Sequence, residues 1–222
     1  MSRPQLLTPM FVDHAGTGLV IAGLRRYNLF TTLFFLGRHR RLLAEFVTLS
    51  GARGGEHALD IGCGPGKLVR ALGAAVGPGG AAVGIDPSAT AIADNRRRDR
   101  AAQHRYEVGP AQDLPLPDAA FDVVTCTFVM HHIPEAQRTA ALAQMWRVLR
   151  PGGRVLLADA SPSPRLRRAL SVVLRSGGDP FAAVDIRHYT EPLRALGFTE
   201  LTYTRSRDQT GILTGIKPTR LT

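Results

Sequence analysis

The glycine-rich stretch 59–66, Leu-Asp-Ile-Gly-Cys-Gly-Pro-Gly, constrains the fold of this chain more than any other feature. It overlaps a short apolar run at 58–61 and opens a helical pattern through Leu68, Leu72 and Val76. Glycine lets the backbone turn sharply and approach a ligand closely, because it has no Cβ. In an open parallel sheet, ligands bind beyond the carboxyl ends of the strands. The stretch therefore predicts a strand–turn–helix unit with a ligand site at the turn.

Strand-like apolar runs alternate with amphipathic helical patterns over most of the chain. Strands are predicted at 58–61, 81–85, 105–108, 121–127, 154–158, 198–204 and 211–216. Helices are predicted over the pattern that begins near Leu68 and at 89–103, 134–149, 165–174 and 190–196. Such alternation indicates a parallel sheet, whereas the last two strands follow each other with no full helix between them. We therefore expect a doubly wound α/β fold: a mostly parallel seven-stranded sheet with helices on both faces and an antiparallel C-terminal hairpin.

The first 50 residues have a different pattern. An irregular start precedes an amphipathic helix predicted at 25–49. We expect residues 1–50 to form a helical segment that caps a ligand-binding domain at 51–222, within a single globular unit. Arginines beside the apolar face, such as Arg38 and Arg41, leave open the alternative of a membrane-surface helix, and hence a peripheral membrane contact.

Composition limits the partners of the chain. The formal charge of +10 would suit a polyanion, but the basic residues are dispersed, and no aromatic RNA platform accompanies them, so nucleic-acid binding is not favoured. Cys63 and Cys126 are the only cysteines, and they indicate neither a disulfide framework nor a zinc site. The longest apolar runs, at 19–24 and 33–36, are too short to span a bilayer. We expect a soluble cytoplasmic protein with no transmembrane segment and no metal.

The spacing of the glycines limits the classes of ligand that the turn could bind. A dinucleotide site has G-x-G-x-x-G, whereas here the third glycine is Gly66, and a phosphate-cradling loop would need Ser or Thr where Leu68 follows Lys67. About twenty residues beyond the turn, Asp86 ends the second predicted strand. A carboxylate there can accept hydrogen bonds from both hydroxyls of a ribose, although an Asp at a strand end is also often a helix cap. Together, the two motifs favour a nucleoside ligand that need not carry phosphate.

In these residues the chain resembles the class I S-adenosylmethionine-dependent methyltransferases, whose first motif is acid-x-G-x-G-x-G and whose second is an acid that ends strand two. The similarity extends to 109–118, 121–124 and 148–153, which match the family's adenine-side loop, fourth strand and approach to the fifth strand. The resemblance implies that the cofactor is S-adenosylmethionine, that the product is S-adenosylhomocysteine, and that a small molecule accepts the methyl group.

The resemblance also assigns cofactor-binding positions. It places Asp60 near the amino-acid end of the cofactor, Asp86 on the ribose, and Ala111 and Gln112 beside the adenine. Pro110 stands where relatives commonly have Asp or Asn, and proline cannot bond the adenine amino group, so that contact must shift to a neighbour such as Gln112 or Asp113. The full expected set is Asp60, Gly62, Cys63, Gly64, Gly66, Asp86, Pro87, Ala111, Gln112 and Thr127.

A looser similarity concerns the acceptor. The stretches 27–29 and 36–40 resemble a helix of the quinone-biosynthesis C-methyltransferases. Those enzymes usually have Asp at the position of Asn28, and Gly-Leu-Arg-Asn where this chain has Val-Met-His-His at 129–132. The acceptor is therefore predicted only as a small aromatic, quinone-like or natural-product molecule, methylated at carbon, oxygen or nitrogen.

Methyl transfer from a sulfonium needs mainly a positioned nucleophile and the exclusion of water, because the cofactor already carries a good leaving group. A base near neutrality would still help a phenol, amine or carbon acceptor, and His131 and His132, after the fourth strand, are the candidates. Packing is the alternative role for this pair. Tyr27, Met130 and Tyr189 are candidates for the acceptor pocket, with a place in the core as the alternative.

Two other functions remain open at this stage. A protein of this fold could retain the cofactor without transferring its methyl group. The charge of +10 would suit an RNA methyltransferase. The sequence predicts neither the oligomeric state nor the identity of the acceptor.

Overall fold

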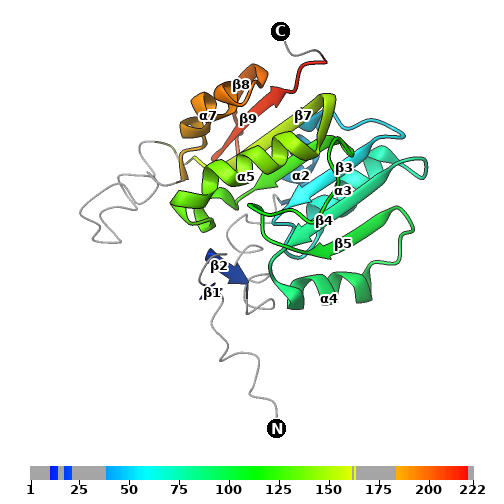
Figure 1. The fold of residues 1–222 in the computed structure, drawn as a ribbon. Coiled ribbons are helices and arrows are strands. Elements are labelled where there is room, and N and C mark those ends of the chain that lie inside the picture. Colours follow the sequence, from blue (N-terminus) through cyan, green and yellow to red (C-terminus); the bar gives the residue numbers. More distant parts are fainter. Residues whose placement is uncertain (1–10, 15–17, 22–38, 162, 164–183, 220–222) are drawn as a thin grey trace.

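The computed structural model describes residues 11–14, 18–21, 39–161, 163 and 184–219, and its centre is a twisted seven-stranded sheet (Figure 1). The order of the strands across the sheet is β5-β4-β3-β6-β7-β9-β8. Their bounds are β3 His57–Ile61, β4 Ala81–Asp86, β5 His104–Val108, β6 Phe121–Thr127, β7 Leu149–Ala160, β8 Thr199–Arg205 and β9 Thr210–Ile216. The first strand of this sheet, β3, therefore lies inside it, next to the central strand β6.

The direction of the strands confirms the predicted doubly wound fold. β3 pairs in parallel with β4 and β6, and the outer pairs β4–β5 and β6–β7 are also parallel. β9 is antiparallel to both β7 and β8, as expected for the C-terminal hairpin. The chain winds outward from β3 to β5 and then returns to β6 on the other side. The strand order thus reverses between β3 and β6, the point where open α/β sheets bind ligands.

Helices cover both faces of this sheet. Their bounds are α2 His39–Ser50, α3 Lys67–Val76, α4 Ala89–Arg98, α5 Glu135–Val148 and α7 Thr190–Ala195, with the short 3₁₀ helices η1 Met130–His132 and η3 Ile186–Tyr189. Residues of α5, η3 and α7 belong to one buried cluster, and residues of α2, α3 and α4 belong to a second. These two clusters form the core on either side of the sheet.

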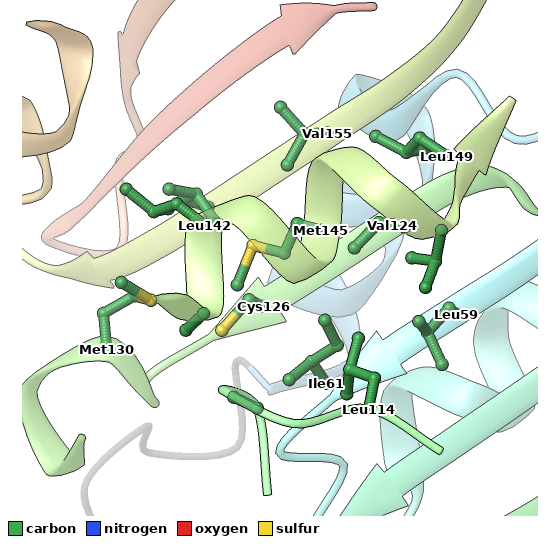
Figure 2. Close-up of a cluster of buried hydrophobic side chains, with 14 of the residues drawn as sticks. Leu59, Ile61, Leu114, Val124, Cys126, Met130, Leu142, Met145, Leu149 and Val155 are labelled. Atoms are coloured by element: carbon green, nitrogen blue, oxygen red, sulfur yellow. The ribbon is translucent and has the colours of Figure 1, made fainter. Parts of the chain in front are cut away.

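Neighbouring residues of one strand belong to different clusters, because successive side chains point to opposite faces of the sheet. On β6, Val124 packs in the α5 cluster and Val123 in the α2–α3 cluster. On β7, Leu157 and Leu156 divide in the same way. Figure 2 shows α5 in front of β6 and β7 in the first cluster. Continuous apolar runs such as 121–127 are therefore strands that are buried on both faces.

Several boundaries differ from the sequence prediction. The helix α4 ends at Arg98 rather than near 103, because Asp99 has an extended backbone. The strand β7 begins at Leu149 rather than 154, since Leu149 already pairs with Phe121 before an irregularity in the register. Of the helix predicted at 25–49, only the part from His39 lies within the described residues, and the helix predicted at 165–174 lies outside them.

The prediction of an irregular N-terminus was wrong over two short segments. β1 Phe11–His14 and β2 Gly18–Ile21 form a two-stranded antiparallel sheet. Each strand has four residues, too few for an alternating pattern to identify it in the sequence. This hairpin contacts η1, which follows β6, so it lies at the edge of the main sheet where the parallel strands end (Figure 1). Among the described residues, no helix is both long and apolar enough to cross a membrane.

Gly73, inside α3, provides a test of the packing between this helix and β5. A Cβ at this position would lie 1.9 Å from Nε2 of His104, whose ring is fixed by a 2.9 Å contact with Asp99. Alanine normally stabilises a helix interior by about 1 kcal/mol relative to glycine. We predict that Gly73→Ala instead lowers the free energy of unfolding by about 1–3 kcal/mol, measured by urea denaturation, because the ring must move.

The control for this prediction is the same substitution in a His104→Ala background. There, Gly73→Ala should be neutral or stabilising, because the obstructing ring is gone. A stabilising effect of Gly73→Ala in the unmodified chain would contradict the packing described.

Candidate cofactor and acceptor site

The glycine-rich turn between β3 and α3 adopts a backbone that needs glycine. Gly62, Gly64 and Gly66 have φ of +71°, +47° and +68°, in the left-handed region. A Cβ on Gly62 would lie 2.2 Å from the side chain of Val129, and one on Gly66 would lie 2.8 Å from that of Asn95. The first and third glycines are thus fixed by packing as well as by backbone conformation.

Asp86, at the end of β4, holds this turn through its carboxylate. The backbone N–H of Gly64 donates to Oδ2 and that of Ser88 donates to Oδ1, both at 2.8 Å. Burial raises the pKa of the Asp86 carboxyl, against the lowering effect of these two hydrogen bonds. The N-cap of α4 is Ser88, which accepts the N–H of Ala91, so Asp86 is not the helix cap that its position also allowed. Each carboxylate oxygen keeps the capacity to accept a further hydrogen bond.

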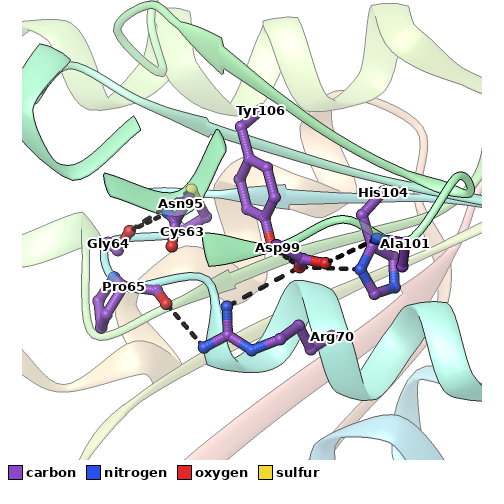
Figure 3. A network of polar contacts seen from close by, with 9 residues as sticks. All are labelled: Cys63, Gly64, Pro65, Arg70, Asn95, Asp99, Ala101, His104 and Tyr106. Carbon is purple, nitrogen blue, oxygen red and sulfur yellow. Dashed lines mark hydrogen bonds and ion pairs between the residues drawn. The ribbon is translucent and has the colours of Figure 1, made fainter. Parts of the chain in front are cut away.

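A buried polar network supports the turn from the side of α3, α4 and β5 (Figure 3). At its centre, Oδ2 of Asp99 accepts the hydroxyl of Tyr106 at 2.6 Å and lies 2.9 Å from Nδ1 of His104. The guanidinium of Arg70 lies 3.9 Å from the same oxygen. The carboxylate of Asp99 therefore ties β5 to α3, directly behind the turn.

Two members of this region bond the backbone of the turn itself. Arg70 donates to the carbonyl of Pro65 at 2.9 Å, and the Asn95 amide donates to the carbonyl of Gly64 at 2.7 Å (Figure 3). These side chains fix the conformation in which Gly64 presents its N–H to Asp86. Sequence reasoning missed Asn95 and Asp99, because nothing in the local pattern links them to residues about thirty positions away.

Asp60, in β3, is a buried carboxyl without a described cation beside it. Its Oδ1 accepts the hydroxyl of Thr125 at 2.8 Å, and none of the ion pairs between described residues includes it. Burial, the largest cause, raises the pKa of Asp60 to about 7; the Thr125 hydrogen bond lowers it and Asp86 raises it. A positively charged group beside Asp60 would stabilise its ionised form, so this position suits a cationic part of a ligand.

The remaining predicted cofactor residues lie around the same edge of the sheet. Ala111 is buried in the loop after β5, and Gln112 donates to Oε1 of Gln137 on α5 at 2.7 Å. Pro87 and Thr127 are half-buried at the ends of β4 and β6. Cys63 is buried with a raised thiol pKa, caused mainly by burial, and packs where a Cβ on Gly84 would lie 2.8 Å from its sulfur.

Arg147 fixes the loop 109–118, although sequence reasoning did not single it out. From the end of α5 it donates to the carbonyls of Leu116 at 2.7 Å and Leu114 at 2.9 Å. The loop begins beside Asp86, whose backbone carbonyl accepts the N–H of Gly109. These bonds set the position of Ala111 and Gln112 relative to the end of β4.

On the other side of β3, the two candidate histidines differ in their surroundings. Nδ1 of His131 lies 2.7 Å from Oδ2 of Asp159, a buried residue of β7, and a quarter of the His131 side chain is exposed. The two histidine rings are in contact, with centroids 3.9 Å apart and planes tilted by 49°. Burial, and secondarily His131, lowers the pKa of His132 to about 4, so His132 is neutral near pH 7.

The residues predicted to contact the acceptor do not form one common site among the described residues. Met130 and Tyr189 are buried in the core cluster of α5, as the alternative interpretation allowed, whereas Tyr27 lies outside the described residues. Burial raises the pKa of Tyr189, Arg138 lowers it and Asp159 raises it, so the Tyr189 hydroxyl lies within electrostatic reach of the His131–Asp159 pair. Among the described residues, no group of three or more His, Cys, Asp or Glu is arranged to hold a metal.

Comparison with known proteins agrees with this geometry. A family model described as a methyltransferase domain matches residues 58–153. A ubiquinone/menaquinone biosynthesis C-methyltransferase of Burkholderia mallei is 34% identical over 177 residues, which cover 76% of this chain and 72% of the relative. The chain belongs to the class I S-adenosylmethionine-dependent methyltransferases.

Two further relatives define the extent of this likeness. A demethylmenaquinone methyltransferase of Symbiobacterium thermophilum is 35% identical over 139 residues, and the chain spans only 55% of that relative's length. The crystal structure of a SAM-dependent methyltransferase from Aquifex aeolicus superposes with a TM-score of 0.64 at 19% identity, covering 80% of this chain and 88% of the other chain. The second comparison supports the fold alone.

The cofactor of this family, S-adenosylmethionine, suits the residues present. Its ammonium group matches the chemistry of the buried Asp60 carboxyl, and its ribose hydroxyls match the remaining acceptor capacity of Asp86. The glycine turn leaves the edge between β3 and β4 free of side chains at three positions. No phosphate-binding feature is needed.

The raised pKa of Asp60 predicts how the stability of the chain without cofactor depends on pH. Between about pH 4 and pH 7 the folded state holds a proton on Asp60 that the unfolded chain has released, so this contribution to stability is lost as the pH rises. We predict that Asp60→Asn removes this loss of stability with rising pH, because asparagine does not ionise. Relative to the unmodified chain, the variant should gain roughly 2 kcal/mol in unfolding free energy between pH 5 and pH 8.

Urea denaturation of both proteins at the two pH values measures this difference. Asp118→Asn, at an exposed carboxyl, is the matched control and should show no comparable gain. An equal difference between Asp60→Asn and the unmodified chain at pH 5 and pH 8 would contradict the assignment.

Proposed function

We propose that this chain transfers the methyl group of S-adenosylmethionine to a small aromatic, quinone-like or natural-product acceptor. The observation that carries the proposal is the 2.8 Å hydrogen bond from the N–H of Gly64 to the carboxylate of Asp86. It brings the ends of β3 and β4 together. The turn after β3 offers a glycine backbone that a ligand can approach closely, and the end of β4 offers a carboxylate that can accept hydrogen bonds from sugar hydroxyls. The names of the relatives support a small acceptor.

In this proposal each cofactor residue acts through a specific group. Asp86 accepts the ribose hydroxyls, Asp60 receives the ammonium group, and Ala111 and Gln112 lie beside the adenine. Gln112 donates one N–H of its amide to Gln137, which holds the side chain on the α5 side of this loop. The backbone and side chains that complete the pocket are those of Gly62, Cys63, Gly64, Gly66, Pro87 and Thr127.

The protein contributes mainly by positioning and by excluding water. When bound, S-adenosylmethionine supplies the methyl group and a thioether leaving group. The residues of η1, with Met130, Tyr189 and Tyr27 as proposed acceptor contacts, hold the acceptor at the ends of β3 and β6. We also include residues 1–50 as a cap over the domain at 51–222, because β2 contacts η1 at this edge.

Of the two histidines, His131 is the better candidate for a base. His132 has a pKa lowered to about 4 by burial, which makes it a weak base near neutrality. His131 is partly exposed and has a carboxylate partner. A cytoplasmic location, which the composition predicted, remains part of this proposal.

Binding of the cofactor is the first test. We predict that calorimetry detects S-adenosylmethionine binding to the unmodified chain, and that Asp86→Asn weakens the affinity at least about tenfold, because one carboxylate oxygen is replaced by an amide donor. Asp94→Asn, at a carboxylate of α4 that pairs with Arg97 and Arg98, is the matched control and should bind normally. Undiminished binding by Asp86→Asn would count against the proposed ribose contact.

Product analysis separates methyl transfer from the two other functions. With quinols and phenols as acceptors, we expect S-adenosylhomocysteine and a methylated product in equal amounts. Conversion of an acceptor without S-adenosylhomocysteine would indicate a protein that keeps the cofactor without using its methyl group. Salt-sensitive binding and methylation of RNA would indicate the third function.

A further inference from the structure

We propose that Asp159 is a positioning residue for His131, and that the pair removes a proton from a hydroxyl of an aromatic acceptor. This inference rests on the proposed function and specifies its acceptor class. The proton moves from the hydroxyl to Nε2 of His131, and the electron pair released on the acceptor oxygen forms the bond to the methyl carbon. The carbon–sulfur bond breaks, and its electron pair stays on sulfur.

The geometry determines which ring nitrogen is the base. An ionised carboxylate only accepts hydrogen bonds, so the contact of 2.7 Å requires Nδ1 of His131 to carry the proton. Nε2 then has the free lone pair. The other oxygen of Asp159 accepts the N–H of Ala160 at 2.8 Å, which fixes the rotation of the carboxylate. No hydrogen bond joins Nε2 to any residue that the structure describes.

The position of the pair favours a chemical role. A buried carboxylate paired with histidine gives little net stability, because desolvation offsets the attraction. The side chain of Asp159 is only 2% exposed, whereas that of His131 is 25% exposed, so the pair runs from the interior to an open surface. It lies at the ends of β6 and β7, at the ligand-binding edge of the sheet.

Other ionisable groups around the pair come from four elements. The His132 ring contacts that of His131 within η1, and its lowered pKa keeps it neutral. Tyr189 on η3 and Arg138 on α5 interact with each other, and Tyr189 also interacts with Asp159. Asp60 on β3 and Asp159 both act on the buried Cys126 between them. His131 is the member of this group that combines exposure with a hydrogen bond to a carboxylate.

The activity test uses acceptors of graded acidity: hydroquinone, catechol and 4-nitrophenol, whose hydroxyl is largely ionised at pH 8. We expect His131→Ala and Asp159→Asn to lower kcat for hydroquinone at least about 100-fold, with the affinity for S-adenosylmethionine unchanged. The loss should be smaller for 4-nitrophenol, because its proton has already left. Added imidazole should restore part of the activity of His131→Ala. His188→Ala, at an exposed histidine of η3, is the matched control and should behave like the unmodified chain.

Nitrogen NMR of the unmodified protein tests the pair without any acceptor. We expect His131 to carry its proton on Nδ1, and an Nε2–H ring would overturn the proposal even if Asp159→Asn failed to fold. An equal loss of activity for all three acceptors would assign the pair a purely structural role. Normal cofactor binding with no methylation of any of them would overturn the acceptor class, whereas absence of cofactor binding would instead contradict the proposed function.

Discussion

The contact between the Asp86 carboxylate and the backbone of Gly64 is the constraint on which the site depends. It joins the end of β4 to the turn that follows β3, and the same carboxylate orders the start of α4 through the N–H of Ser88. Burial makes this interaction costly to lose, because a backbone donor or a carboxylate oxygen would then be left without a partner. The turn therefore keeps one conformation before any ligand arrives.

This arrangement requires support from parts of the chain that are distant in sequence. Asn95 bonds the carbonyl of Gly64, and Arg70 connects Pro65 to the Asp99 network of β5. The left-handed backbone of the turn is permitted by glycine, but these side chains select it from the alternatives that glycine also allows. A preorganised site of this kind reduces the ordering that binding must impose.

Charge is distributed unevenly along the carboxyl edge of the sheet. Asp60 and Asp86 are buried carboxyls with raised pKa values on one side, which suits a ligand that brings positive charge and hydroxyl donors. On the other side, Asp159 is already paired with His131. The fold thus separates a region for the cofactor from a region for acceptor chemistry, and β3 and β6 form the boundary between them.

The sequence alone determined the alternation of strands and helices and the two motifs that flank the ligand edge, because both depend on local patterns: apolar periodicity, and glycines at a fixed distance after a strand. It therefore predicted the doubly wound sheet and the placement of Asp60, Gly64 and Asp86. Tertiary structure decided the ends of α4 and β7, the hairpin β1–β2, and the partner of each histidine. These features depend on contacts between residues that are distant in sequence. Asp159 and His131, for example, are 28 positions apart, and no local sequence pattern indicates their contact.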